Sequence, residues 1–271
     1  MTQAKLRRGA ALTIVLSGLM TSVAQTDAAA ESVAPTEIAA RLMAGYPGLV
    51  TGVDGNVVTF AGGTTLPLDD GKGEKPFQTW LDAPDIEDMF RLHYPAGAPA
   101  TAALENFDPG RARNAAFLQK IYGDCRTGGV EKNLVDVDWL PRKSGGRVKV
   151  TSINGVAAKL KAVSDALDAL PKSFDVYLRP IGGTYNCRVV AGTQNVSAHS
   201  YGIAIDIAVA RADYWRWAKG GPAGRIRYRN RIPLEIVTAF EQHGFIWGGR
   251  WHHYDTMHFE YRPELLGQPG P

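Results

Sequence analysis

The stretch Ser197–Val209, SAHSYGIAIDIAV, says most about the fold of this 271-residue chain. Within it three isoleucines alternate with small or acidic residues, and this two-residue period predicts a strand. The isoleucine face would enter a core, and the other face would carry Asp206 between Ala204 and Ala208, which leave a hollow above the carboxylate. A carboxylate in such a hollow needs a positive partner, either a metal ion or an arginine. His199, which precedes Gly202, can fold back over the same face.

A second polar strand is predicted within Trp247–Pro263, WGGRWHHYDTMHFEYRP, where apolar residues alternate with His258 and Glu260. Together with His199 and Asp206, His258 completes a set of two imidazoles and one carboxylate. Three such ligands make a catalytic zinc (Zn2+) site, because the fourth position stays open for water. Asp255, three residues before His258, is placed to take a proton from that water and return it to a leaving amine.

The rest of the chain predicts an α+β fold, in which a small antiparallel sheet carries the zinc site between flanking helices. Turn residues at Asp54-Gly55 and Gly62-Gly63 predict a hairpin in Gly52–Gly71. The other expected elements are helices over Ser32–Gly45 and Trp80–Tyr94, a strand over Arg147–Ile153, a helix capped by Asn154 that runs to Pro171, a strand over Phe174–Leu178 and a helix after Pro233. We expect an N-terminal lobe of unknown role over 31–124, since it has no cluster of ligand-type residues, and a zinc domain over 125–271.

The first residues have the outline of a secretory signal. Lys5, Arg7 and Arg8 precede an apolar run, Ala10–Met20, and small residues follow. The run is shorter than the roughly 20 apolar residues of a membrane span. We expect a signal peptide over 1–24, cut after Ala24 or alternatively as late as Ala30, and export to the periplasm or cell envelope. No cysteine follows the run, which excludes a lipoprotein anchor.

The charge of the chain gives no reason to expect a nucleic-acid partner. The sequence pI is 8.8, but the three basic residues of the signal account for the whole formal charge of +3. One local excess of arginine and lysine remains, and it is either a solvated face or a patch that attracts an anionic polymer. Its members are Arg211, Arg216, Lys219, Arg225, Arg227, Arg229 and Arg231.

Cys125 and Cys187 are the two cysteines of the chain. An oxidising compartment would allow them to form a disulfide, and two separate buried thiols are the alternative.

The motifs SxHxxGxAxD and, about 50 residues later, GFxWGGxW with DxxHFE resemble the D-alanyl-D-alanine carboxypeptidase and L-alanyl-D-glutamate endopeptidase family, the VanY-like and VanX-like zinc peptidases. The resemblance covers roughly Val148 to Arg262. It implies zinc ligands at His199, Asp206 and His258 and a catalytic acid/base at Asp255. Family members also carry an arginine upstream of SxH, for which Arg188 is the candidate here.

Four further residues are candidate substrate contacts, each with a structural alternative. Arg188 would bind a substrate carboxylate or polarise the scissile carbonyl, or else form a structural salt bridge. Ser197 would bond the substrate backbone or close a turn. Trp247 and Trp251 would line the cleft or pack in the core.

The remaining candidates lie near the predicted ligands. His252 and His253 would stabilise a developing oxyanion or substitute as ligands, or have neither role. Glu260 is expected to orient His258, since a fourth protein ligand would close the catalytic position. His93 and His243 are expected to be structural.

These features predict an exported monomer that hydrolyses a peptide bond involving a D-amino acid in peptidoglycan stem peptides. A D-Ala-D-Ala carboxypeptidase is favoured, and an L-Ala-D-Glu endopeptidase is the first alternative. A zinc-bearing binding module without catalysis is the second. A serine hydrolase built on Ser197 would lack the GxSxG elbow.

Overall fold

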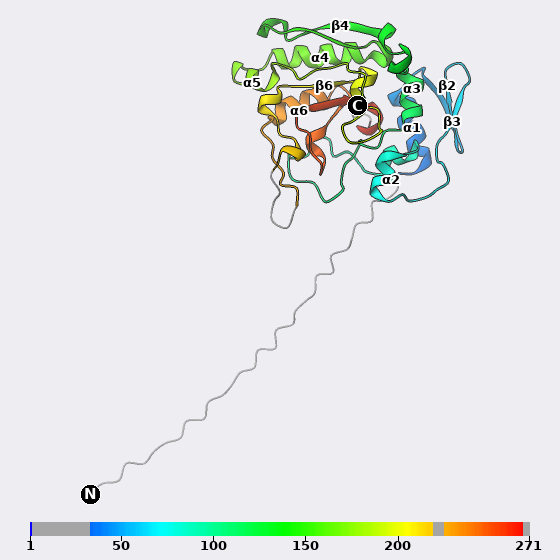
Figure 1. Ribbon diagram of the computed structural model, residues 1–271, viewed down its shortest axis with the longest axis horizontal. Coiled ribbons are helices and arrows are strands. Elements are labelled where there is room, and N and C mark those ends of the chain that lie inside the picture. The colour runs from blue at the N-terminus through cyan, green and yellow to red at the C-terminus, as the bar shows by residue number, and fades with distance from the viewer. Residues whose placement is uncertain (2–32, 219–224, 268–271) are drawn as a thin grey trace. The chain divides into compact units, whose positions relative to one another are not determined.

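Helices and short strands follow one another in irregular order in the computed structural model (Figure 1), which describes Met1 and residues 33–218 and 225–267. The helices are α1 (Pro35–Gly45), α2 (Phe77–Asp82), α3 (Ala115–Tyr122), α4 (Val156–Asp168), α5 (Asp175–Leu178) and α6 (Leu234–Glu241). The strands are β1 (Val50–Asp54), β2 (Val57–Phe60), β3 (Thr65–Pro67), β4 (Leu134–Trp139), β5 (Gly146–Thr151), β6 (Ala204–Asp206), β7 (Phe245–Trp247) and β8 (His258–Tyr261). They pair into small antiparallel sheets, so the predicted α+β class is confirmed.

The central sheet has the strand order β6–β8–β7. Ile205 pairs with Phe259, and the ring of Phe259 stacks on Phe240 of α6 with centroids 3.8 Å apart. Because side chains alternate across a strand, burial of this apolar face leaves the neighbouring pair, Asp206 and His258, on the other face.

Helix α4 runs between β4 and the central sheet (Figure 1). It buries Val156, Leu160, Val163 and Leu167 at the predicted helical spacing. The predicted strand before it is confirmed as β5, and the helix after Pro233 as α6.

The cap of α4 is a correction. The N-cap is Gly155, whereas Asn154 has a φ of 53° and donates a side-chain hydrogen bond to the Gly45 carbonyl at 2.8 Å. Asn154 therefore joins two parts of the fold instead of capping the helix.

The N-terminal part contributes α1 and the β1–β2–β3 sheet, which confirms the predicted first helix and hairpin. Helix α1 buries Ile38 and Leu42 in the same hydrophobic core as the central sheet. Just beyond it, the Tyr46 hydroxyl donates to Glu264 at 2.8 Å. Residues of the N-terminal and C-terminal parts thus share one core. The expected division into an N-terminal lobe and a zinc domain stays a prediction about the roles of these two parts.

Two predicted elements are wrong in type or extent. The helix expected over Trp80–Tyr94 is α2 followed by a 3-10 helix, Glu87–Phe90, because Pro84 disfavours helical backbone at the residue before it. The strand expected over Phe174–Leu178 is a 3-10 turn followed by α5. Its apolar residues recur at a spacing of three to four, which suits a helix, and short apolar runs are ambiguous between the two.

The strand expected over Ser197–Val209 is also wrong in extent, because only Ala204–Asp206 is β6. A 3-10 helix, Ala198–Tyr201, precedes it, and the chain reverses at Gly202, whose φ is 68°. A Cβ atom there would lie 2.9 Å from the backbone nitrogen of Thr151. The turn needs glycine both for its dihedral angle and for the close approach of β5.

Cys125 and Cys187 form a disulfide, as expected. The bond ties the loop that carries Arg188 to the segment that follows α3.

The predicted signal peptide, apart from Met1, and Lys219 of the basic stretch lie outside the described residues. Within the described ranges, no helix has the length and apolar composition that a membrane span requires.

Candidate metal centre

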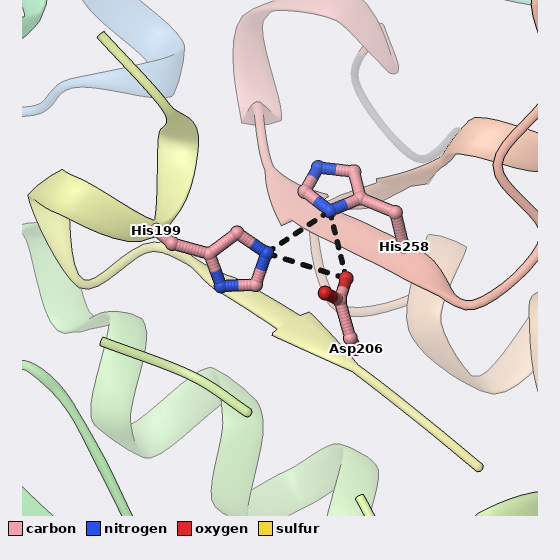
Figure 2. Close-up of side chains that lie close together, drawn as sticks. All are labelled: His199, Asp206 and His258. Carbon is pink, nitrogen blue, oxygen red and sulfur yellow. Dashed lines mark hydrogen bonds and ion pairs between the residues drawn. The ribbon is translucent and has the colours of Figure 1, made fainter. Parts of the chain in front are cut away.

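Side chains from three elements converge on one point beside the central sheet (Figure 2). Nε2 of His199 lies 3.3 Å from Nδ1 of His258 and 3.2 Å from Oδ1 of Asp206. Nδ1 of His258 lies 3.0 Å from the same oxygen. These three residues form a group whose donor atoms are all close enough together to hold a metal ion. The structure therefore brings the three predicted ligands together.

Backbone pairing explains why two of them meet. Asp206 and His258 are directly opposite in the antiparallel β6–β8 ladder, so their side chains leave the same face of the sheet. His199 reaches that point from the 3-10 helix before Gly202. Ser197 begins this helix, and its hydroxyl accepts from the His199 backbone N–H at 3.4 Å.

Each histidine presents one nitrogen to the centre and bonds elsewhere through the other. Nδ1 of His199 contacts the Thr184 carbonyl, and Nε2 of His258 lies 3.0 Å from Oε2 of Glu260. A carbonyl and a carboxylate can only accept, so these outer nitrogens carry protons, and the inward nitrogens are the ones that would offer lone pairs to a bound metal. Glu260 thus has the orienting position expected from the sequence.

The donor set fits zinc in distance as well as in chemistry. Tetrahedral ligands at zinc bond lengths are separated by about 3.3 Å, and the three measured separations are 3.0, 3.2 and 3.3 Å. Burial alone would raise the pKa of Asp206, but hydrogen bonds from His199 and His258 outweigh burial and hold it well below its usual range. Its carboxylate is therefore ionised over the whole physiological pH range, as a ligand must be.

Asp255 is a half-buried residue beside this group, and its backbone carbonyl accepts from the His258 N–H at 3.2 Å. Its Oδ1 atom is buried and has no hydrogen-bond partner among the described residues. Burial raises the pKa of Asp255 to about 6, although the charge of His258 acts in the opposite direction. A carboxyl group that changes protonation near neutral pH, with a free oxygen, is suited to accept and return a proton.

A segment before α3 supplies charged residues that the sequence reasoning missed. The guanidinium of Arg113 donates hydrogen bonds to the Glu260 carboxylate. Its Nε lies 3.0 Å from both carboxylate oxygens, and its Nη2 lies 2.5 Å from Oε2. Arg262 adds a contact of 3.2 Å from the other side. Burial raises the pKa of Glu260, but these two arginines and His258 outweigh it and hold the pKa well below its usual value. Glu260 is therefore a fixed anion behind His258.

Nothing in the local sequence marks Arg113 as part of the site. It lies 147 positions before Glu260, in a stretch with no histidine or cysteine and no periodic pattern. Only the fold of the N-terminal part places it beside β8.

The predicted substrate contacts have different surroundings. Arg188 is exposed, and its guanidinium has one weak contact among the described residues, to the Val189 carbonyl at 3.4 Å. Trp247 is fully buried, and its indole N–H donates to the Thr256 carbonyl at 2.9 Å. Trp251 is also buried, but its ring lies 5.8 Å from that of His258. Trp247 therefore packs in the core, which was its structural alternative, and contact of Arg188 or Trp251 with substrate stays a prediction.

His252 and His253 lie outside the group of three. His252 accepts from the Asn106 backbone N–H, and the Nδ1 atom of His253 lies 2.6 Å from Oδ2 of the buried Asp108. His93 is exposed and His243 is half-buried, and neither belongs to the group.

A second acidic group, Asp69, Asp70 and Asp85, has oxygens within metal-binding distance of one another. The ammonium of Lys75 already lies 2.9 Å from Asp85 and 3.1 Å from Asp70. An internal ammonium thus already contacts two of the three carboxylates.

The geometry of two histidines, one aspartate and a buried proton acceptor agrees with the family that the motifs resemble. Residues 191–261 match the family model described as D-alanyl-D-alanine carboxypeptidase. The predicted resemblance is confirmed over this segment, and the match indicates a peptidase. The carboxypeptidase-family segment contains the candidate ligands and Asp255, whereas Arg188 and Arg113 lie before it. No curated protein and no solved structure matches the chain.

Proposed function

We propose that this protein is an exported zinc peptidase that hydrolyses a peptide bond involving a D-amino acid in peptidoglycan, most specifically the D-Ala-D-Ala bond of stem peptides. The observation that carries the proposal is the group of His199, Asp206 and His258 beside the unpartnered carboxyl oxygen of Asp255. The family description supports carboxypeptidase action. The motifs that predict export lie in residues 1–24, and periplasmic location is part of the proposal.

The side chains of this chain would divide the work as follows. With zinc bound, His199 and His258 would each offer an imidazole nitrogen, and Asp206 would offer a carboxylate oxygen. Zinc held by these three residues would supply Lewis-acid chemistry and would lower the pKa of a bound water toward neutrality. Asp255 accepts the proton of the attacking water at its free oxygen. It then gives this proton to the amine as the peptide C–N bond breaks.

Two other functions remain as alternatives. An L-Ala-D-Glu endopeptidase would use the same ligands and Asp255 on an internal bond. A zinc-bearing binding module would have no use for Asp255, and burial of a proton acceptor beside the ligands therefore favours an enzyme.

The test is an assay of the purified, zinc-loaded full chain on muropeptides, with the products identified by mass. Loss of one alanine residue from pentapeptide stems, abolished by a chelator and restored by zinc, is the expected result. Cleavage only after L-alanine would establish the endopeptidase instead. Intact muropeptides in the presence of stoichiometric zinc would contradict an enzyme of either kind.

A further inference from the structure

Arg111 and the candidate ligand His258 both lie beside the ring of Trp251. The guanidinium carbon of Arg111 lies 5.6 Å from the Trp251 ring centre, and that ring lies 5.8 Å from the imidazole of His258. Burial raises the pKa of Asp255, and the charge of Arg111 is among those that act against burial. Arg111 and the candidate ligand His258 are thus neighbours of one indole, and Arg111 is within electrostatic reach of the predicted proton acceptor.

The guanidinium of Arg111 is largely unused within the fold. An arginine has five N–H donors, and among the described residues Arg111 makes one side-chain hydrogen bond, from Nη1 to Oδ2 of Asp108 at 3.3 Å. The same Asp108 carboxylate also accepts two shorter bonds from His253, at 2.6 and 2.9 Å. Asp108 therefore holds Arg111 in position and leaves most of its donors available.

The neighbouring arginine shows what a structural role looks like here. Arg113 also lies over Trp251, at 5.9 Å, but it directs its guanidinium onto Glu260 with three contacts of 3.0 Å or less. Arg111 has no comparable carboxylate partner in the described residues, and its side chain keeps 21% of its surface exposed. A cation that is held in place, partly exposed and short of acceptors is suited to bind an anion from solution.

We infer that Arg111 is a substrate-binding residue that receives a free carboxylate of the peptide, an inference that rests on the proposed function. In a D-Ala-D-Ala substrate the terminal carboxylate lies one residue beyond the scissile carbonyl, roughly 4 Å away. At that distance from a carbonyl bound at the centre, the carboxylate is within reach of side chains that surround the centre, and Arg111 beside Trp251 is one such side chain. The α-carboxylate of a γ-linked D-glutamate is a second source of the same chemistry. If Arg111 binds the substrate carboxylate, the remaining substrate contact predicted for Arg188 is the scissile carbonyl.

The experiment compares three peptides on the zinc-loaded full chain. They are a stem pentapeptide that ends in D-Ala-D-Ala, its C-terminal amide, and the same pentapeptide with D-glutamate replaced by D-isoglutamine. The variants are Arg111→Gln, Arg111→Lys and, as a control, Arg147→Gln, whose side chain is 72% exposed on β5. Zinc content and the thermal midpoint of each variant are measured alongside, so that loss of folding or metal is recognised.

The wild-type protein should prefer a peptide with one particular carboxylate over its amidated form. Arg111→Gln should lower kcat/KM for the carboxylate form roughly 10- to 100-fold, mainly through KM, and leave the amidated form unchanged. Arg111→Lys should recover part of the preference, and Arg147→Gln should match the wild type. The wild-type preference identifies which carboxylate Arg111 binds. It is the terminal carboxylate if the C-terminal amide is cleaved more slowly, and the D-glutamate carboxylate if the isoglutamine peptide is cleaved more slowly.

Full retention of the wild-type preference in Arg111→Gln would overturn the inference. So would a wild-type enzyme that cleaves all three peptides equally well. Absence of cleavage of every peptide by the wild type would instead contradict the proposed function, and the inference with it.

Discussion

Oε2 of Glu260 lies 3.0 Å from Nε2 of His258, on the opposite side of the imidazole ring from Asp206, whose Oδ1 lies 3.0 Å from Nδ1. One histidine thus connects a candidate metal position to a buried anion, and Arg113 and Arg262 hold that anion from behind. The candidate ligand His258 is therefore linked by hydrogen bonds through Glu260 to Arg113 and Arg262, neither of which is a candidate ligand.

Glu260→Gln should therefore weaken metal binding without removing a ligand. An amide cannot strengthen the imidazole as a carboxylate does, and the loss of such a partner typically costs about 10- to 100-fold in metal affinity. Zinc competition with a chromophoric chelator measures the effect. Glu37→Gln, at a side chain that is 51% exposed on α1, is the matched control. Equal zinc affinity in Glu260→Gln and the wild type would show that the hydrogen bond does not tune the ligand.

Metal uptake should release a proton from His258. Burial lowers its pKa, but hydrogen bonds to Asp206 and Glu260 outweigh burial and raise the pKa to about 9 in the metal-free protein. At pH 7 the ring is therefore protonated, and a metal can bind Nδ1 only after that proton leaves. Apparent affinity should rise about tenfold per pH unit below pH 9, and close to one proton should appear per zinc ion.

Calorimetry of zinc binding at pH 7 in buffers of different ionisation enthalpy counts the protons. A count of zero in the wild type would contradict the protonated state assigned to His258.

Asp255→Asn and His258→Ala should separate chemistry from metal binding. The first removes the proton acceptor and should keep zinc while kcat falls by about 10² or more. The second removes a ligand and should lose both zinc and activity. Elemental analysis and steady-state kinetics on the same preparations give the two readouts. Near wild-type turnover in Asp255→Asn would remove this residue from the mechanism, and full zinc in His258→Ala would remove that one from the ligand set.

The same carboxyl group sets an expected pH limit. Asp255 accepts a proton only when ionised, and its pKa is raised to about 6 by burial. Activity should therefore be present above that pH and be lost as the pH falls through it. A bound dication lowers the pKa of a nearby acid, so the midpoint should lie at or below about 6. A profile of kcat/KM against pH checks the limb, which Asp255→Glu should displace.

The disulfide should contribute measurably to stability. Cys125 and Cys187 are separated by 62 positions, and closing a loop of that length is worth about 4 kcal/mol in the chain-entropy model. The double variant Cys125→Ser, Cys187→Ser should unfold at lower denaturant concentration. Reduction of the wild type should have the same effect, and the double variant should no longer respond to reductant. An unchanged midpoint in both cases would mean that the loop closure does not stabilise the fold.

The sequence predicted the parts of the fold that depend on local pattern. The heptad-like burial of α4 and the turn chemistry of the β1–β2–β3 sheet have strong local signals and are confirmed. The strand expected over Phe174–Leu178 failed because four apolar residues in a five-residue segment do not separate helix from strand. Ser197–Val209 failed in extent because the chain reverses at Gly202, and alternation of side chains alone does not show where a strand begins or ends.

The candidate ligands could be chosen from motif spacing, since Asp206, His258 and His199 lie within or beside two short strands. The residues that surround them could not. Asp108, Arg111 and Arg113 lie more than 80 positions from any ligand, and long-range packing alone decides which charges meet. Long-range ion pairs leave no periodic trace in a single sequence.

The ion pair between Arg113 and Glu260 also limits which segment of the chain could be transferred by recombination and still form the metal centre. The carboxypeptidase-family segment, 191–261, contains His258 and Glu260, whereas Arg113 lies before it and Arg262 just after it. A recombination event that moved only this segment would carry all the ligands and leave a buried anion without its cations, which destabilises a protein by roughly 3–5 kcal/mol. Transfer of the metal ligands without loss of stability would therefore require Arg113 to be transferred with them, although it lies far from them in the chain.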